Sequence, residues 1–200
     1  MQESKSNKYF SVKYMAGLAV AIVLAIFIGS QIGNGDTTAE KTAAPDTSVS
    51  QENNTTTDVE SGSVEEMLTF LVEEEKLAHD LYVQLAQSSG SMQFNNILNS
   101  EVTHISLVQG LLASYDIVDP TIGLAEGEFL NPDLQALYDS LLVSGSVDRA
   151  GAIAAGIAVE EKDIADIEAM LATELPSDVV SVLERLLSGS QNHLAAFQRG

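Results

Sequence analysis

The stretch that decides the fold is Glu73–Tyr82, with the sequence EEEKLAHDLY. It lies in a segment whose apolar residues recur every three or four positions, the spacing of a helix with one buried face. Glu75 falls on this apolar face, between Leu71 and Ala78. Because burying an unpaired carboxylate costs several kcal/mol, a glutamate at this position needs a buried partner. The stretch therefore predicts a helix that carries a polar group into the core.

The same periodicity extends outward in both directions. The expected helices cover about residues 63–87, 93–115, 131–143, 146–173 and 176–198. Ser63 and Glu66 form a capping box at the first start, and Asn131 followed by Pro132 marks the start of the short third helix. No segment alternates with period two. The sequence predicts an all-α fold, a four-helix bundle with one short extra helix.

The other three long helices also place polar side chains on their apolar faces. These side chains are Glu101 and His104, then Glu161 and Glu168, then Ser190 and His193. Glu160 is close in phase to Glu161, and an internal repeat decides between them, because it aligns Glu75 with Glu161 and His104 with His193. We interpret the matched positions as a duplicated helical hairpin whose halves meet around one site.

The polar side chains are of types that bind metal ions. A Glu and a His three positions apart lie on one helical face, so both can reach the same metal centre. Oxygen-rich ligation with one nitrogen per metal favours iron or manganese over copper(I). The chain has no Cys, which excludes thiolate zinc and iron–sulfur sites and a cysteine nucleophile.

These residues resemble the ligands of the ferritin-like superfamily of di-iron carboxylate bundles. The segments EEEKLAHDLY, SEVTH, NPDLQALYD, EEKDIADIE and GSQNHLAAF are similar to an uncharacterised exported branch, domain of unknown function 2202, over about residues 63–198. That superfamily uses one Glu from each of two helices and a Glu-x-x-His from each of two others. Carried over residue by residue, the resemblance implies metal ligands at Glu75, Glu101, His104, Glu161 and His193.

Ser190 stands where the resemblance would place the last glutamate. The second metal then lacks a carboxylate unless Glu160, Asp163 or Asp166 turns inward, so the site holds two iron ions or only one, with manganese as an alternative metal. The additional candidate ligands are His79, Glu160, Glu168 and Ser190. His79 lies four residues after the first glutamate and is either a ligand or a structural side chain.

The neighbours of these candidates have simpler interpretations. Glu73 and Glu74 are expected on a solvated face, because only Glu75 lies on the apolar stripe. Tyr82 is interpreted as a packed ring with a satisfied hydroxyl rather than a redox residue. Glu168 is either a group behind the ligands or a surface residue near the helix end.

The N-terminal part has the composition of a targeting segment. Residues 15–29 are an uninterrupted apolar run behind three lysines, and the largely apolar stretch 14–33 is long enough to cross a bilayer as a helix. We expect residues 1–33 to be an uncleaved signal anchor, with a cleaved signal peptide as the alternative. The folded domain then lies outside the cytoplasm, extracellular or periplasmic, either anchored to the membrane or secreted.

Composition and charge bound the organisation and the partners. Residues 34–62, rich in Thr, Ser, Asn and acids, are expected to be a disordered linker before a domain at 63–200. The 200-residue chain has 9 Lys and Arg against 29 Asp and Glu, a net charge of −20. This charge repels nucleic acid and attracts cations.

Two functions follow as hypotheses. In the first, implied by the resemblance, a reduced metal pair reacts with oxygen or peroxide, which would make the protein an oxidoreductase. In the second, the protein is a non-catalytic metal-binding or scavenging module at the cell surface. The sequence does not decide whether the chain is an enzyme or a homo-oligomer. Without a Cys motif, any electron donor is a separate molecule.

Overall fold

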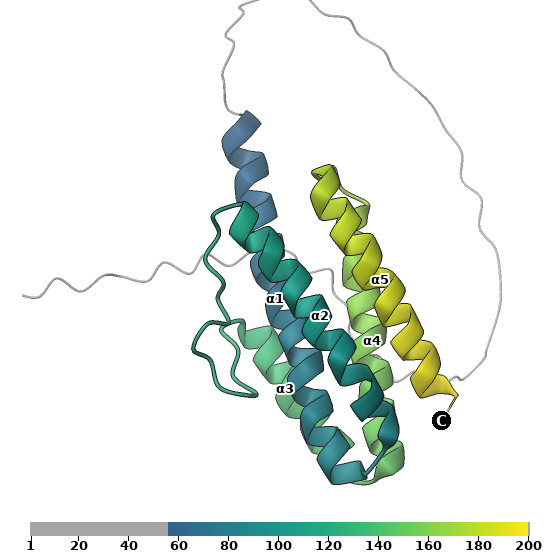
Figure 1. Ribbon diagram of the computed structural model, residues 1–200. Helices are drawn as coiled ribbons and strands as arrows, with labels where there is room; N and C mark the ends of the chain where they lie inside the picture. The colour runs from purple at the N-terminus through teal and green to yellow at the C-terminus, as the bar shows by residue number, and fades with distance from the viewer. Residues whose placement is uncertain (1–55, 200) are drawn as a thin grey trace, which may run out of the picture. The chain divides into compact units, whose positions relative to one another are not determined.

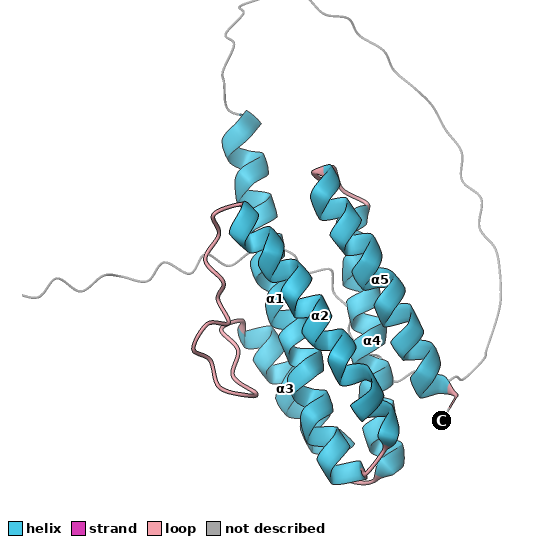
Figure 2. Cartoon of the chain, viewed as in Figure 1, coloured by secondary structure: helices cyan, strands magenta, loops and turns pink. Residues whose placement is uncertain are grey.

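The computed structural model describes residues 56–199, and the side chains of residues 64–199. This part of the chain contains helices and no strands (Figures 1 and 2). The helices are α1 (Thr56–Ser89), α2 (Met92–Ser114), α3 (Pro132–Gly145), α4 (Arg149–Leu171) and α5 (Ser177–Gln198). The predicted all-α class and the positions of the five helices are confirmed. The expected anchor at 1–33 and most of the expected linker lie outside the described residues.

The helix ends follow local chemistry, with two departures from expectation. The Asn131 side chain caps α3 by accepting from the backbone N–H groups of Asp133 and Leu134, at 2.9 and 3.3 Å. Helix α4, expected from residue 146, begins instead behind Asp148, whose carboxylate caps it by accepting from the Gly151 N–H at 2.7 Å. The first helix begins at Thr56 instead of Ser63, since no proline interrupts the residues between them.

The four long helices enclose a common core. Helix α1 packs against α2 and α4, and α5 packs against α4 and α2, so that each long helix has two long neighbours (Figure 1). The short α3 lies against α1 and α4. Within residues 56–199, no helix combines the length and the apolar composition that crossing a membrane requires.

The core consists of two apolar layers. The first includes Leu68, Leu71, Val108, Ile167 and Leu183. The second includes Leu81, Tyr82, Phe94, Val159 and Phe197. Along every long helix, buried polar residues separate the members of one layer from those of the other. The fold therefore holds a polar layer at the middle of the bundle, closed by apolar packing on both sides.

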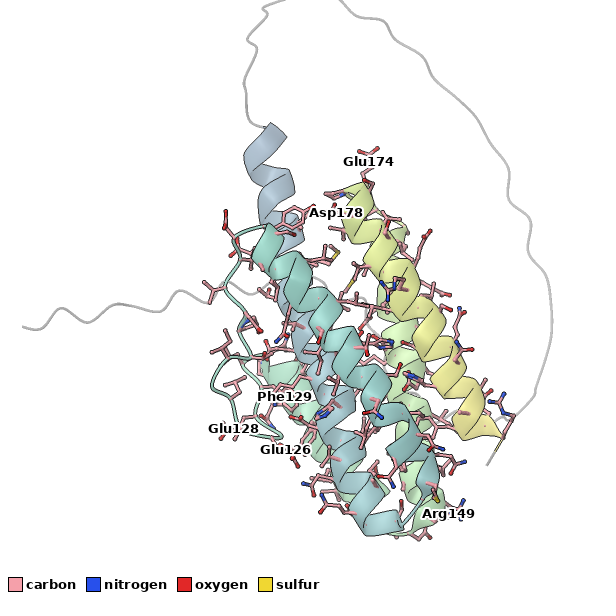
Figure 3. All side chains as sticks on the ribbon, viewed as in Figure 1. Glu126, Glu128, Phe129, Arg149, Glu174 and Asp178 are labelled. Atoms are coloured by element: carbon pink, nitrogen blue, oxygen red, sulfur yellow. The ribbon has the colours of Figure 1, made fainter. Side chains whose placement is uncertain are left out.

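The loop between α2 and α3 is fastened to α1 by charged side chains. Glu73 accepts from the N–H groups of Leu130 and Asn131 at 2.6 and 3.0 Å, and Asp80 accepts from the N–H of Gly127 at 2.9 Å. Figure 3 shows Phe129 on this loop beside α3. The expectation that Glu73 is solvated is wrong, since its side chain is buried to hold this loop.

Candidate metal centre

Eight buried polar residues meet in the middle of the bundle, and none is more than 7% exposed. They come from all four long helices. They are Glu74, Glu75, Glu101, His104, Glu160, Asp163, Ser190 and His193. Five of them are carboxylates, so the cluster concentrates negative charge where water cannot screen it. Below we call these eight residues the central cluster.

The two histidines turn the same ring nitrogen toward carboxylates. The Nδ1 atom of His104 lies 3.2 Å from a Glu75 oxygen and 3.6 Å from a Glu101 oxygen. The Nδ1 atom of His193 lies 2.8 Å from the other Glu101 oxygen and 3.4 Å from Glu160. The two rings are stacked, with centroids 5.3 Å apart. The Glu101 carboxylate therefore bridges the Nδ1 atoms of the two imidazoles.

Three of these side chains have the spacing of a metal site. One ligand atom each from Glu101, His104 and His193 lies within 4.8 Å of the others. Ligand atoms around one ion at bond lengths near 2.1 Å are about 3 to 4.2 Å apart, so only small movements would bring all three onto one ion. These residues form a group that could hold a metal ion.

Several ligand atoms of the cluster have no hydrogen-bond partner. Within the described residues, these buried atoms are Glu74 Oε2, Glu75 Oε1, Glu101 Oε1, Asp163 Oδ1 and His193 Nδ1. Glu101 Oε1 and His193 Nδ1 are only 2.8 Å apart, yet the angles between them do not suit a hydrogen bond. Buried polar atoms without partners are rare, because each one costs free energy. Cations bound among these carboxylates and the imidazole would supply such partners, so the residues present fit a metal centre.

Asp163 and Ser190 form a second part of the cluster. The Ser190 hydroxyl donates to Asp163 Oδ2 at 2.5 Å, which leaves Oδ1 of the aspartate free. Both side chains are at most 5% exposed. Asp163 on α4 therefore supplies a buried carboxylate beside the α5 position where serine replaces the expected glutamate.

Tyr82 connects the cluster to the apolar layer that holds Phe94 and Phe197. Its hydroxyl donates to Glu160 Oε1 at 2.6 Å, and its ring lies 5.4 Å from each of the two phenylalanine rings. The interpretation of Tyr82 as a packed ring with a satisfied hydroxyl fits this position. Burial and the adjoining Glu160 carboxylate raise the pKa of Tyr82 well above its usual value, so the phenol stays protonated.

Lys162 covers the cluster on the side where α1 and α4 meet. Its ammonium donates to Glu74 at 2.6 Å, also pairs with Asp166, and lies 5.0 Å from the centre of the Phe70 ring. Glu74 itself is 3% exposed, so the expectation that it is solvated is wrong. The lysine compensates one of the five carboxylates and leaves the rest of the charge uncompensated.

Protons take up part of this charge in the metal-free protein. Burial alone would lower the pKa of His104, but the Glu101 and Glu75 carboxylates outweigh it and raise the pKa to about 10. For His193, Glu101 and Glu160 outweigh burial in the same way and raise the pKa to about 9. Both imidazoles therefore carry a proton at neutral pH when no metal is bound.

The carboxylates differ among themselves. Burial raises the pKa of Glu75 to about 7, and burial together with the charge of Glu75 raises that of Asp163 well above its usual range. Burial would also raise the pKa of Glu101, but its two histidine neighbours lower it. Glu101 is therefore the carboxylate that stays charged most readily, consistent with its place between the imidazoles.

Most of the residues predicted from the sequence come together, and three do not. Glu75, Glu101, His104 and His193 all lie in the central cluster, together with the additional candidates Glu160 and Ser190. Glu161 and Glu168 are exposed on α4. His79 stands apart from the cluster, with its Nδ1 atom 3.0 Å from Asp80 and its side chain 28% exposed.

The placement of Glu161 is a correction with a steric cause. Helix α4 packs through the small residues Ala152, Ala155 and Gly156, and a Cβ atom at Gly156 would lie 2.9 Å from the Phe197 ring. This close packing turns the helix so that Glu160 faces inward and Glu161 faces out. The helical face on which the prediction relied is therefore off by one residue.

Sequence reasoning gave little weight to two members of the cluster. Asp163 was only a conditional ligand, and Glu74 was assigned to the solvated face. The signal that locates Asp163 is its helical spacing from Gly156, a small residue on the packed face of α4. Glu160 and Asp163 follow Gly156 at helical intervals, so all three lie on the same face of the helix. Burial of Glu74 depends on Lys162 from another helix, which one helical pattern does not reveal.

The chain matches known but uncharacterised proteins. The family described as "Uncharacterized protein domain (DUF2202)" matches residues 64–200. The uncharacterized protein MJ0754 of Methanocaldococcus jannaschii is 39% identical over 127 residues, which are 64% of this chain and 69% of that protein. The crystal structure of hypothetical protein MJ0754 is similar with a TM-score of 0.67 and 34% identity, over 79% of this chain and 84% of that chain.

Proposed function

The chain belongs to the DUF2202 family, and we propose that it is a metal-binding protein of the ferritin-like type. The central cluster would hold two divalent ions, iron or manganese. Glu75, Glu101, His104, Glu160 and His193 would be ligands, in positions on four helices that resemble the ferritin-like pattern. Asp163 would replace the carboxylate that the last helix lacks.

One observation carries this proposal: the cluster holds five buried ligand atoms without partners and an uncompensated charge. Its five carboxylates and the Lys162 ammonium have a formal charge of −4, with both imidazoles neutral. Two divalent cations would neutralise this charge, whereas one would leave half of it buried. The charge therefore supports two ions, and mixed oxygen and nitrogen ligands favour iron or manganese.

Bound iron or manganese would supply electrons for the reduction of oxygen or peroxide. The protein's own residues would bind the ions and keep water away from them. Tyr82, Phe94 and Phe197 close the cluster on one side, with aromatic centroids 5.0 to 5.4 Å apart. Tyr82 would also fix the orientation of Glu160 through its hydrogen bond. A separate molecule would provide electrons for repeated turnover.

A second candidate is a non-catalytic binding or scavenging module. It is favoured by Ser190, which leaves α5 with a histidine and no carboxylate of its own. A metal ion held by fewer charged ligands exchanges more readily, which suits delivery or capture of ions better than turnover. The two candidates differ in whether loaded protein consumes oxygen or peroxide.

We further propose that the protein acts outside the cytoplasm. The apolar run at residues 15–29, behind three lysines, supports a membrane anchor, with secretion after cleavage as the alternative. The metal-binding domain would begin near residue 63, after the polar segment at 34–62. Nucleic acid is not a proposed partner, because the chain carries a net charge of −20.

Metal analysis tests the proposal. Full-length protein, stripped with chelator and reloaded anaerobically with ferrous or manganous ion, should contain about two ions per chain by mass spectrometry. His104→Ala should lower this content, whereas His79→Ala is the matched control and should not. Reloaded protein that contains no more metal than the chelator-stripped protein would refute the site. Oxygen uptake after addition of ferrous ion then separates the redox function from the binding module.

A further inference from the structure

A pocket of about 380 Å³ lies between α2 and α5, on the outer side of the His104 ring. His104 is the member of the central cluster that lines it. Its Nδ1 atom faces Glu75 and Glu101, so the opposite edge of the ring, with Nε2, faces α5. The imidazole thus separates the buried carboxylates from the pocket.

Gly189 makes this arrangement of the ring possible. A Cβ atom at position 189 would lie 2.3 Å from His104 Nε2 and 2.6 Å from Cε1, far closer than real contacts allow. Gly110 on α2 is different, since a Cβ atom there would meet nothing within 4 Å. The missing side chain at 189 is therefore what gives the imidazole edge its room against α5.

The pocket collects hydrogen-bond donors and has no carboxylate among its lining residues. Arg185, Ser188 and Asn192 line it from α5, and Ser100 and Thr103 line it from α2. Facing stripes of neighbouring helices in a bundle are usually apolar, but here the lining is polar except for Leu107 and Gly189. The polar lining indicates a surface that binds something other than another helix.

Arg185 gives the pocket a positive charge. Lys76 and Lys162 are held in ion pairs with Asp80 and Glu74, whereas Arg185 is exposed and forms no ion pair within residues 64–199. His104 Nε2 likewise has no hydrogen-bond partner in that range. An imidazole whose Nδ1 is engaged by a carboxylate or a metal ion usually binds an acceptor through its other nitrogen.

We propose that the pocket between α2 and α5 binds a small oxyanion, held by His104 Nε2, the Arg185 guanidinium and the hydroxyls of Ser100 and Ser188. A guanidinium and an imidazole N–H match the acceptor oxygens of a carboxylate or phosphate. The net charge of −20 does not prevent this, because repulsion from carboxylates beyond about 8 Å is screened at physiological salt, and the two nearest, Glu75 and Glu101, face the His104 Nδ1 atom on the other side of the ring. The oxyanion contacts the Nε2 atom of His104, so oxyanion binding also affects the central cluster, to which His104 belongs.

The test uses the metal-free full-length chain labelled with ¹⁵N-histidine, which gives signals from only three imidazoles. Inorganic phosphate should shift the His104 signals saturably, with a Kd on the order of 1 mM, and leave those of His79 unchanged. A parallel titration with acetate distinguishes a preference for carboxylates from one for phosphate. Absence of a saturable His104 shift with either anion would overturn the proposal.

Two pairs of matched variants make the test specific. Arg185→Gln should weaken phosphate binding at least about tenfold, whereas Arg199→Gln, at an exposed arginine outside the pocket, should not. Gly189→Ala should abolish the His104 shift, and Gly110→Ala should preserve it. Equal effects of the two arginine variants would show attraction by overall charge only and refute the site. The arginine pair decides the matter even if Gly189→Ala fails to fold. Because no metal is present, the outcome is independent of the proposed metal function.

Discussion

Metal binding to the central cluster should release protons in a countable number. We expect this release when the metal-free protein is titrated with Mn²⁺ at pH 7, where both cluster histidines are protonated. Their pKa values are about 10 for His104 and about 9 for His193, because adjoining carboxylates outweigh the effect of burial. A metal ion replaces the proton on each ligand nitrogen. Loading should therefore release at least about two protons per chain.

The same pKa values set the pH dependence of binding. Each proton that must leave makes the apparent association constant rise about tenfold per pH unit, as long as the pH is below the pKa. Displacement of the protons of both histidines then raises the overall association constant for full loading about a hundredfold per pH unit between pH 6 and 8. Glu75, with a pKa raised by burial to about 7, steepens the rise at the lower end of this range.

Calorimetry in two buffers with different heats of ionisation counts the protons. His104→Gln should release about one proton fewer than the unchanged chain, whereas His79→Gln should release the same number, because His79 lies outside the cluster. An association constant that does not change between pH 6 and 8 would contradict this prediction. It would mean that the metal does not displace protons from the imidazoles.

Three further outcomes follow from the packing and charge of the bundle. In the folded, metal-free protein the pKa is raised to about 9 for His193 and to about 10 for His104. The protonated histidines therefore stabilise the fold fully below the unfolded pKa of about 6.5, and this stabilisation is lost as the pH rises through 9 and 10. Thermal melts should show Tm falling over this range without metal and holding steady with it. Gly156→Ala should destabilise the protein by about 1 to 3 kcal/mol in urea unfolding, since its Cβ atom would press on Phe197 at 2.9 Å. Tyr82→Phe removes the donor to Glu160 and should cost about 1 to 3 kcal/mol in the metal-free protein, with a smaller loss after loading; equal losses in both states would count against Glu160 as a ligand.

Helical periodicity was sufficient to predict the all-α class and all five helices. Large aliphatic side chains on α1 and α2 mark the buried faces of these helices without ambiguity, and Glu75, Glu101 and His104 were assigned to the core on that basis. Helix ends were less predictable. Helix α4 was expected to begin at residue 146, but it begins at Arg149 behind Asp148, whose carboxylate accepts from the Gly151 N–H.

Helix α4 was harder because two of its bulky residues, Ile153 and Ile157, are not among its most buried ones. Ile153 and Ile157 suggest one face, yet the helix turns Ala152, Ala155 and Gly156 inward. Small residues let two helices approach closely, and a partner ring can then occupy the space that a larger side chain would fill. The internal repeat that aligns Glu75 with Glu161 carries no information about this packing, and it therefore selects Glu161 instead of Glu160.

The composition of the central cluster lies further beyond what one helix can reveal. When α5 is considered alone, Ser190 is interpreted as a position that lacks the expected carboxylate ligand. Its hydroxyl, however, donates to the Asp163 carboxylate on α4 at 2.5 Å. Likewise, Glu74 is tolerated in the interior because Lys162 from α4 lies 2.6 Å away. In both cases the requirement for a carboxylate or a countercharge belongs to the shared site and not to any one helix. The balance of charge across the four helices, rather than the pattern on each, would therefore determine how many cations the proposed site accepts.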